Sequence, residues 1–171
     1  MTGTTVIVMG LVHKGPVDIK QMLKAVEKVS KEQFIELQLV DASKVFGKEH
    51  LELAAQKAIR AFKEGRNFGK TLAVEVLLYA SGKRQISQAI KFMGLRDGIT
   101  ELAAIIIAEH GKKIPADLPR MLELERDDKV LEGSDDVLEA FGIGPQARKG
   151  IPKSRWGDLV LEKVALLDLE K

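Results

Sequence analysis

The segment from residue 72 to residue 80 constrains the fold more than any other part of the sequence. It reads Leu-Ala-Val-Glu-Val-Leu-Leu-Tyr-Ala, and Glu75 is its only charged residue, so we expect it to be buried on most sides. We predict a helix over residues 70–81 that ends at Gly82, because glycine readily adopts the left-handed backbone that terminates helices. Cations bracket this helix: Arg66 and Lys70 before it, and Lys83 and Arg84 after it. The pattern predicts a core helix that holds positive charges at the surface.

The basic residues before this helix break a local rule. A cation opposes the helix dipole in the first turn, yet Lys70 falls there, with Arg66 just upstream. Such a conflict is typical of functional positions, and a helix N-terminus beside two cations is a ready anion site. Lys83 and Arg84 follow the C-terminal end, where cations suit the dipole, and Arg60 lies near the end of the preceding helix. For the last three residues, capping or simple solvation is an open alternative.

Charge is unevenly distributed along the chain. The 171 residues carry a formal net charge of +2, but residues 60–91 hold seven Lys or Arg and two Glu, a net of +5, which leaves −3 for the remainder. A basic face on an otherwise acidic body is the electrostatic footprint expected for phosphate binding. A chance gathering of solvated lysines is the alternative.

Hydrophobic periodicity indicates strands and helices of a single domain, residues 1–171. Strands are predicted over residues 4–12, 33–40 and 102–108. Further helices are predicted over residues 18–29, with Asp18 as the N-cap, and over residues 48–64, 85–92, 116–126, 134–141 and 156–168. Residues 146–156 are expected to be irregular. The predicted fold class is α+β, with a small mixed or antiparallel sheet packed with a helical layer around the buried central helix.

Several kinds of site are not predicted. The chain has no cysteine, which excludes disulfides and cysteine-ligated metals, and its three histidines stand at no metal-ligand spacing. Gly69-Lys70-Thr71 is no P-loop, because three residues rather than four separate its glycines and a helix precedes them. We therefore predict no enzyme, no catalytic residue, no cofactor and no metal. No apolar run approaches the roughly 18 residues of a membrane span, so a cytoplasmic protein is expected.

Two aromatic features are compatible with binding. Tyr79 and Phe92 flank the basic turn in sequence, and a nucleobase could stack on such a ring beside a cation, although packing of both rings in the core is the favoured alternative. Trp156 is the only tryptophan and begins a predicted helix. Together with the apolar stripe of that helix it could dock a partner protein, or the stripe could belong to the chain's own core. The stripe consists of Val160, Val164 and Leu167.

The residues that follow the central helix resemble a known family. Residues 78–90, Leu-Tyr-Ala-Ser-Gly-Lys-Arg-Gln-Ile-Ser-Gln-Ala-Ile, are similar to the signature of the Cgi family, the small regulatory subunit of the KEOPS complex. Animal members of this family are called PRPK-binding protein. The resemblance extends through residues 47–51, 58–62 and 65–67, is weak over 112–155, and resumes at 161–167. Its specific part is the Ser-Gly-x-Arg-Gln-Ile core, which combines a turn with particular polar residues.

This resemblance implies a non-catalytic subunit, archaeal in type, that binds and stimulates the small atypical kinase/ATPase subunit of KEOPS. The complex makes threonylcarbamoyladenosine in tRNA, and archaeal members are implied to hold tRNA by its single-stranded 3′ CCA end. On this basis we expect Gln85 to contact a base edge or the sugar. Phosphate contacts are expected from five cations: Arg60, Arg66, Lys70, Lys83 and Arg84. The alternative is a pure protein-interaction module that docks the kinase and binds no nucleic acid.

Overall fold

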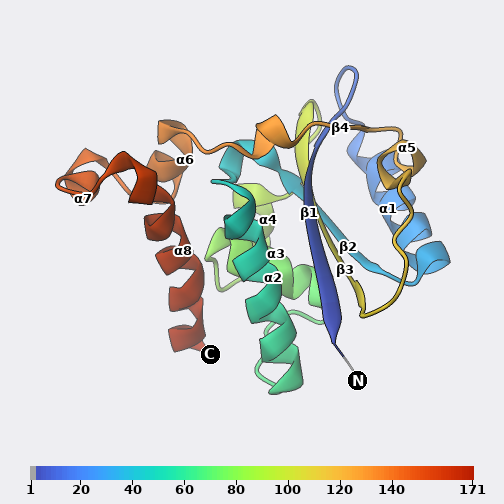
Figure 1. Ribbon diagram of the computed structural model, residues 1–171, viewed down its shortest axis with the longest axis horizontal. Helices are drawn as coiled ribbons and strands as arrows, with labels where there is room; N and C mark the ends of the chain where they lie inside the picture. Colours follow the sequence, from blue (N-terminus) through green and yellow to red (C-terminus); the bar gives the residue numbers. More distant parts are fainter. Residues whose placement is uncertain (1–2) are drawn as a thin grey trace.

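The computed structural model describes residues 3–171 and is built on one four-stranded sheet (Figure 1). The spatial order of the strands is β2-β3-β1-β4, and every pairing is antiparallel. β1 (Thr4–Val12) and β3 (Glu101–Glu109) pair along their whole lengths in the centre. β2 (Glu36–Asp41) forms one edge, and the two-residue β4 (Glu125–Arg126) pairs with the end of β1 at the other. The predicted α+β class is confirmed, and of the two predicted sheet types the antiparallel one is present.

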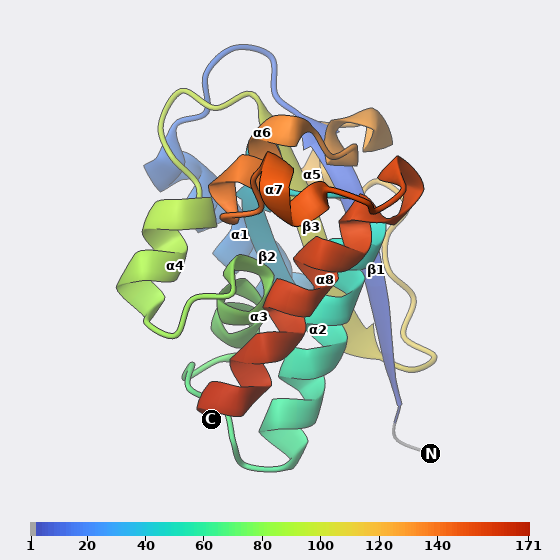
Figure 2. The same cartoon turned by 90° about the vertical axis from the view of Figure 1, so that its left-hand side faces the viewer.

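Helices cover both faces of the sheet (Figures 1 and 2). Along β3, the even-numbered side chains from 102 to 108 pack with α1 (Ile19–Gln33) and α5 (Leu118–Met121). The odd-numbered side chains from 103 to 107 pack with helices of the other layer, which are α2 (Lys48–Lys63), α3 (Leu72–Ser81), α4 (Ile86–Met93) and α8 (Trp156–Leu166). A strand covered on both faces needs apolar residues throughout, which explains the continuous apolar run in the sequence.

α3 is the buried helix that the sequence predicts, since every residue from Glu75 to Ser81 is buried. Its first residue is Leu72, because Thr71 acts as N-cap and its hydroxyl accepts a hydrogen bond from the backbone N–H of Val74 at 3.2 Å. Gly82 ends the helix with a left-handed φ of 68°, as predicted. Lys70 therefore lies just outside the helix rather than in its first turn, and its conflict with the helix dipole is weaker than the sequence indicated.

The other predicted elements are confirmed over the first two thirds of the chain and partly wrong afterwards. Asp18 caps α1, which continues to Gln33, so β2 begins three residues later than predicted. The helix predicted over residues 116–126 is wrong beyond one turn. After α5, Glu123 adopts a positive φ of 59° and the chain enters β4. Pairing of β4 with β1 supplies the backbone hydrogen bonds that a longer helix would have made.

The last part of the chain packs beside the layer of α2, α3 and α4 (Figure 2). Ser134 caps α6 (Asp135–Ala140), as predicted, and α7 (Pro145–Arg148) forms within the region expected to be irregular. Short 3-10 turns complete the structure at Ala42–Lys44, Asp128–Leu131, Lys153–Arg155 and Leu167–Glu170. Within residues 3–171, no helix combines the length and the apolar character that a bilayer crossing requires.

Candidate nucleic-acid interface

The turn between α3 and α4 holds three of the predicted site residues together. Ser81 accepts a hydrogen bond on its hydroxyl from the backbone N–H of Lys83 at 3.1 Å, which fixes the chain directly after α3. Arg84 follows in the turn, and Gln85 occupies the N-cap position of α4 without using its side chain to cap it. Arg84 and Gln85 are exposed, so their side chains are free to meet a ligand.

His50 of α2 supports this turn from inside the protein. Its Nε2–H donates to the carbonyl oxygen of Ala80 at 2.8 Å, and its Nδ1 accepts a hydrogen bond from the backbone N–H of Phe46 at 3.1 Å. Because Nδ1 must accept, the neutral tautomer carries its proton on Nε2. Burial lowers the pKa of His50 to about 4, so the ring is neutral at physiological pH. The last turn of α3 is thereby tied to α2.

Lys83 lies where three surface hollows meet. It lines a hollow of about 490 Å³ with Arg84 and Gln85, and a second of about 410 Å³ with Phe92 and Phe141. A third hollow of about 450 Å³ is also lined by Lys83 and Phe92. The ammonium of Lys83 is 4.9 Å from the centroid of the Phe92 ring, within cation–π range. A partly exposed ring beside cations is the arrangement on which nucleobases stack.

Three cations that we did not assign to the site line the third hollow beside Lys83: Lys44, Lys91 and Arg96. The ammonium of Lys44 is 5.9 Å from the Phe92 ring, and Arg96 pairs with Asp41 at 2.5 Å. Lys91 lies on the exposed side of the amphipathic α4, a signal the sequence contained. Lys44 gave no such signal, because only the tertiary packing of η1 (Ala42–Lys44) brings it to the Phe92 ring, and Arg96 lies in the loop after α4.

The N-terminal end of α3, where the sequence predicts an anion site, is occupied by the protein itself. The carboxylate of Glu75 accepts hydrogen bonds from the backbone N–H groups of Phe68 at 2.9 Å and Gly69 at 2.7 Å. Its other oxygen pairs with the ammonium of Lys171. Because Glu75 takes these loop donors and Thr71 takes the N–H of Val74, the region at the start of α3 offers an external anion fewer free N–H groups.

Arg60 and Arg66 are both paired. Arg60 binds Glu64 at 2.9 Å, and Arg66 binds the other oxygen of Glu64 at 2.7 Å. The hydrogen bonds from Arg60 and Arg66 lower the pKa of Glu64, so it is ionised at neutral pH. Arg66 also lies 3.9 Å from Asp168. A phosphate would have to displace these carboxylates to bind either guanidinium.

Arg66 and the basic turn lie at opposite ends of α3, and the C-terminal segment reaches both. The helix of ten residues spans about 15 Å. However, Asp168 approaches Arg66, and Glu170 lines the hollow that contains Lys83 and Arg84. The C-terminal segment therefore contacts Arg66 with one residue and borders the hollow with another.

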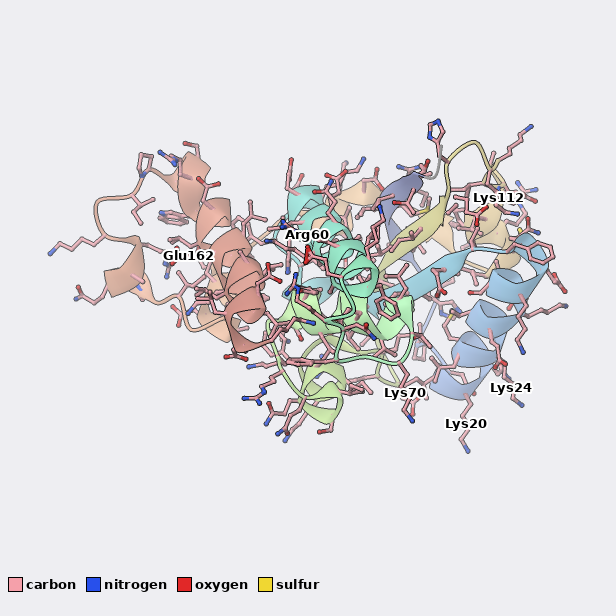
Figure 3. All side chains as sticks on the ribbon, turned by 90° about the horizontal axis from the view of Figure 1, so that it is seen from below. Lys20, Lys24, Arg60, Lys70, Lys112 and Glu162 are labelled. Atoms are coloured by element: carbon pink, nitrogen blue, oxygen red, sulfur yellow. The ribbon has the colours of Figure 1, made fainter. Side chains whose placement is uncertain are left out.

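Lys70 lies apart from the other predicted contacts. It is exposed, makes no ion pair with another residue in the described part of the chain, and projects on the side that also presents Lys20 and Lys24 of α1 (Figure 3). Arg60 lines a separate hollow between α2 and β1 with Lys63. The predicted set therefore divides into a group at the α3–α4 turn, Arg66 at the other end of α3 beside Asp168, and two outlying cations.

Tyr79 is part of the core and not a stacking surface. Its side chain is buried, and its hydroxyl donates a hydrogen bond to Asp168. Burial and this hydrogen bond raise the pKa of Tyr79 well above its ordinary value. Phe92 is the other candidate ring. It packs edge-on against Phe141, with centroids 5.1 Å apart, and keeps a partly exposed face.

The apolar stripe proposed for partner binding belongs to the protein's own core. Val160, Val164 and Leu167 are buried, the last two against α2 and α3, so they form no exposed face. Trp156 is half-buried and donates from its ring N–H to the carbonyl oxygen of Ile151 at 3.0 Å. The apolar side chains that remain exposed in this region are Leu166 and Leu169, with 44% and 81% of their surface accessible.

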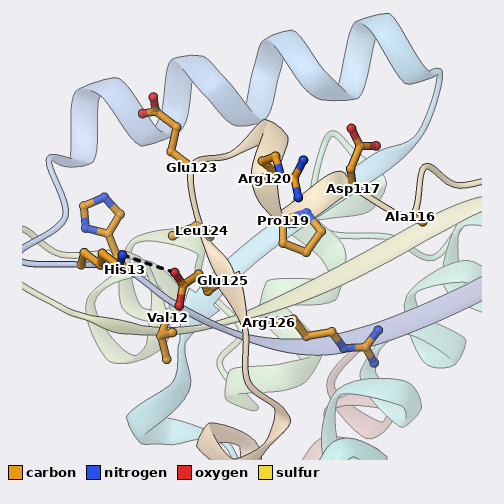
Figure 4. A pocket seen from close by; sticks show the side chains of 11 residues that line it. Val12, His13, Ala116, Asp117, Pro119, Arg120, Glu123, Leu124, Glu125 and Arg126 are labelled. Atoms are coloured by element: carbon orange, nitrogen blue, oxygen red, sulfur yellow. Dashed lines mark ion pairs between the residues drawn. The ribbon is translucent and has the colours of Figure 1, made fainter.

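A larger hollow of about 670 Å³ lies at the far end of the sheet (Figure 4). It is lined by the end of β1 and by residues 116–126, and Lys14 pairs with Glu125 across it at 3.6 Å. Its charges balance, since it holds the acids Asp117, Glu123 and Glu125 and the cations Lys14, Arg120 and Arg126. It lacks the excess positive charge of the hollows around Lys83.

Comparison with known proteins gives consistent matches over most of the chain. Residues 16–167 match the family described as kinase binding protein CGI-121. "Regulatory protein Cgi121" from Methanocaldococcus jannaschii is 31% identical over 144 residues, which cover 80% of this chain and 86% of that protein. "KEOPS complex subunit Cgi121" from Pyrococcus abyssi is 46% identical over 50 residues, or 29% of each chain. With a match of this extent, the chain belongs to the CGI-121 family of kinase-binding proteins.

Proposed function

We propose that this protein is a non-catalytic regulatory subunit of a KEOPS-type complex, which modifies tRNA with threonylcarbamoyladenosine. In this role it binds and stimulates the kinase/ATPase subunit and recruits tRNA through the 3′ CCA end. Its kinase-binding family supports the first part, as do the names of the archaeal regulatory protein and KEOPS subunit to which it is similar.

The RNA-binding part rests on one observation: open cations surround a partly exposed aromatic ring at the α3–α4 turn. Lys83 and Lys44 lie within 6 Å of the Phe92 ring, and Arg84 and Lys91 line the adjoining hollows. Single strands are bound by such a combination, because the cations attract the backbone while unpaired bases stack on the ring. Gln85 offers an amide that can hydrogen-bond a base edge or a ribose hydroxyl.

For the kinase, the exposed apolar residues of the C-terminal segment are the contact we propose. Leu169 is 81% exposed and follows Asp168, whose ion pair with Lys57 at 2.7 Å fixes the segment. Leu166 lies one helical turn earlier and is also exposed. Large apolar side chains held rigidly at a surface are typical of protein interfaces.

Fluorescence anisotropy of the isolated protein with labelled tRNA, intact and with the CCA end removed, tests the RNA-binding part. We expect binding that requires the CCA end and weakens with salt. Three to five phosphate contacts predict a slope of log affinity against log salt of roughly −2 to −3.5, at about 0.7 per contact for single strands. Charge reversal by Arg84→Glu should weaken binding, whereas Lys129→Glu, at an exposed position outside the hollows, is the matched control.

The kinase-docking part is tested separately with the purified kinase subunit. Leu169→Glu should reduce complex formation and leave tRNA affinity unchanged. If the protein binds the kinase but no tRNA, or binds tRNA regardless of its CCA end, the pure protein-interaction module becomes the better account. In that account the exposed leucines carry the function and the cations around Phe92 are a solvated face.

A further inference from the structure

Lys171, the last residue of the sequence, is buried to an extent that is unusual for a lysine. Its side chain is fully buried, as is that of Glu75, and the two form an ion pair across 96 residues of chain. Lysine is almost never fully buried unless it is paired, because removing an ammonium from water is costly. The surroundings of Lys171 must therefore satisfy its charge.

The ammonium of Lys171 meets partners on several sides. Besides Glu75, it donates to the carbonyl oxygen of Arg66 at 3.4 Å. It lies 4.4 Å from the centroid of the Phe68 ring and 4.7 Å from that of the Tyr79 ring. The two rings and the carboxylate enclose the charge, since the side chain of Lys171 is fully buried. Cation–π attraction is strongest in such a place, where water is excluded.

The same contacts hold the loop that precedes α3. Lys171 binds the carbonyl oxygen of Arg66, while Glu75 binds the N–H groups of the two residues Phe68 and Gly69. Asn67 closes the loop by donating from its side chain to the carbonyl oxygen of Gly69 at 2.8 Å. The main chain on both sides of Asn67 is therefore bound to one buried ion pair.

The side chain of Arg66 is contacted by the same C-terminal segment. Asp168 lies 3.9 Å from the guanidinium of Arg66, pairs with Lys57 and accepts from the Tyr79 hydroxyl. Lys171 thus fixes the backbone of Arg66, while Glu64 binds its guanidinium at 2.7 Å and Asp168 adds a more distant negative charge. The same C-terminal segment borders the hollow of Lys83 and Arg84, which Glu170 lines.

We propose that Lys171 is a positioning residue: it orders the loop of residues 66–69 and thereby holds Arg66 where its guanidinium can exchange Glu64 for a phosphate of the bound RNA end. This inference rests on the proposed RNA-binding function and deepens it. Lys171 itself touches no RNA, because its ammonium is enclosed. Its effect on affinity passes through Arg66.

The experiment compares Lys171→Met, Lys171→Arg and the control Lys129→Met by amide hydrogen exchange. In Lys171→Met the Glu75 carboxylate is buried without its partner, and we expect the Phe68 and Gly69 amides to exchange at least about 100-fold faster. The exchange rates of amides in the central strand β3 should change much less. Lys171→Arg, which keeps the cation, should restore slow exchange. Unchanged exchange at Phe68 and Gly69 in Lys171→Met would overturn the inference.

A double-mutant cycle that combines Lys171→Met with Arg66→Ala then distinguishes positioning of Arg66 from a general loss of stability. Affinity for an RNA oligonucleotide that ends in CCA should fall several-fold in Lys171→Met, but Lys171→Met should cause no further loss when Arg66 is already alanine. An equal loss in both backgrounds would mean that Lys171 acts on the whole fold and not through Arg66. If the wild-type protein binds no such RNA, the proposed function fails, and the exchange result still decides whether Lys171 orders the loop.

Discussion

The two ends of α3 carry similar charges in sequence and have different environments in the structure. At the N-terminal end, the carboxylate of Glu75 takes the loop N–H groups and the ammonium of Lys171, and Arg66 is paired with Glu64. At the C-terminal end, Lys83 and Arg84 have no carboxylate within ion-pair distance among the described residues, and open hollows surround them. The number of cations near a helix end therefore does not measure its capacity to bind an anion. What matters is whether the chain already provides the counter-charge.

The largest expected effect is at the N-terminal end. Glu75→Gln leaves the ammonium of Lys171 buried without a counter-ion, and breaking a buried pair in this way costs about 3–5 kcal/mol. Urea unfolding should show this loss. The double variant Glu75→Gln/Lys171→Met, which buries no charge, should recover most of it. Glu49→Gln in the exposed first turn of α2 is the control. If Glu75→Gln proves as stable as wild type, the two ends of α3 do not differ in the way described.

The second prediction concerns the pH dependence of stability and the C-terminal end of α3, which His50 supports. The pKa of His50 is about 4 in the folded protein and about 6.5 when unfolded, so between these values the unfolded state binds more protons. The contribution of neutral His50 to the free energy of unfolding is complete above pH 6.5. It is lost as the pH falls toward 4, which lowers the unfolding free energy by about 3 kcal/mol in total. Unfolding free energies measured across this range should fall more steeply for wild type than for His50→Gln. His110→Gln, at an exposed position, should keep the wild-type slope.

The third prediction tests whether the open cations are the ones that bind RNA. Lys83→Glu and Arg84→Glu should each lower the affinity for a CCA-ended RNA by roughly tenfold or more at low salt, and each should reduce the salt slope by about 0.7. Their melting temperatures should stay close to wild type, because neither side chain is part of the buried core. Equal affinity in both variants would remove the α3–α4 turn from the proposed interface.

The smallest effect is expected at Arg60. Its guanidinium is exposed, it is already paired with Glu64, and it lines a hollow that Lys83 does not share. Exposed pairs contribute little to stability, and this one also competes with phosphate. Arg60→Ala should therefore change RNA affinity less than Arg84→Glu does, and its melting temperature should remain near wild type. A larger loss in Arg60→Ala than in Arg84→Glu would place the RNA path along α2 instead of across the turn.

Part of the candidate site could be predicted from sequence because its residues are neighbours in the chain. Lys83, Arg84 and Gln85 follow a helix end that Gly82 marks, so the local pattern alone brings them together. Lys44 could not be placed in this way, since it comes from a distant segment and meets the turn only around Phe92. The occupation of the N-terminal end of α3 by Lys171 was equally hidden, because 96 residues, more than half of the chain, separate Lys171 from Glu75.

By itself, the sequence determined the α+β class, the buried central helix with its glycine end, and the basic turn after it, because each depends on residues a few positions apart. Only the tertiary structure decided which cations are open and which are already paired, and that the stripe of Val160 and Val164 lies in the core. The physical reason is that burial and counter-charges come from residues far away in the chain. A charged side chain attracts a ligand strongly only where no oppositely charged residue of the protein already pairs with it.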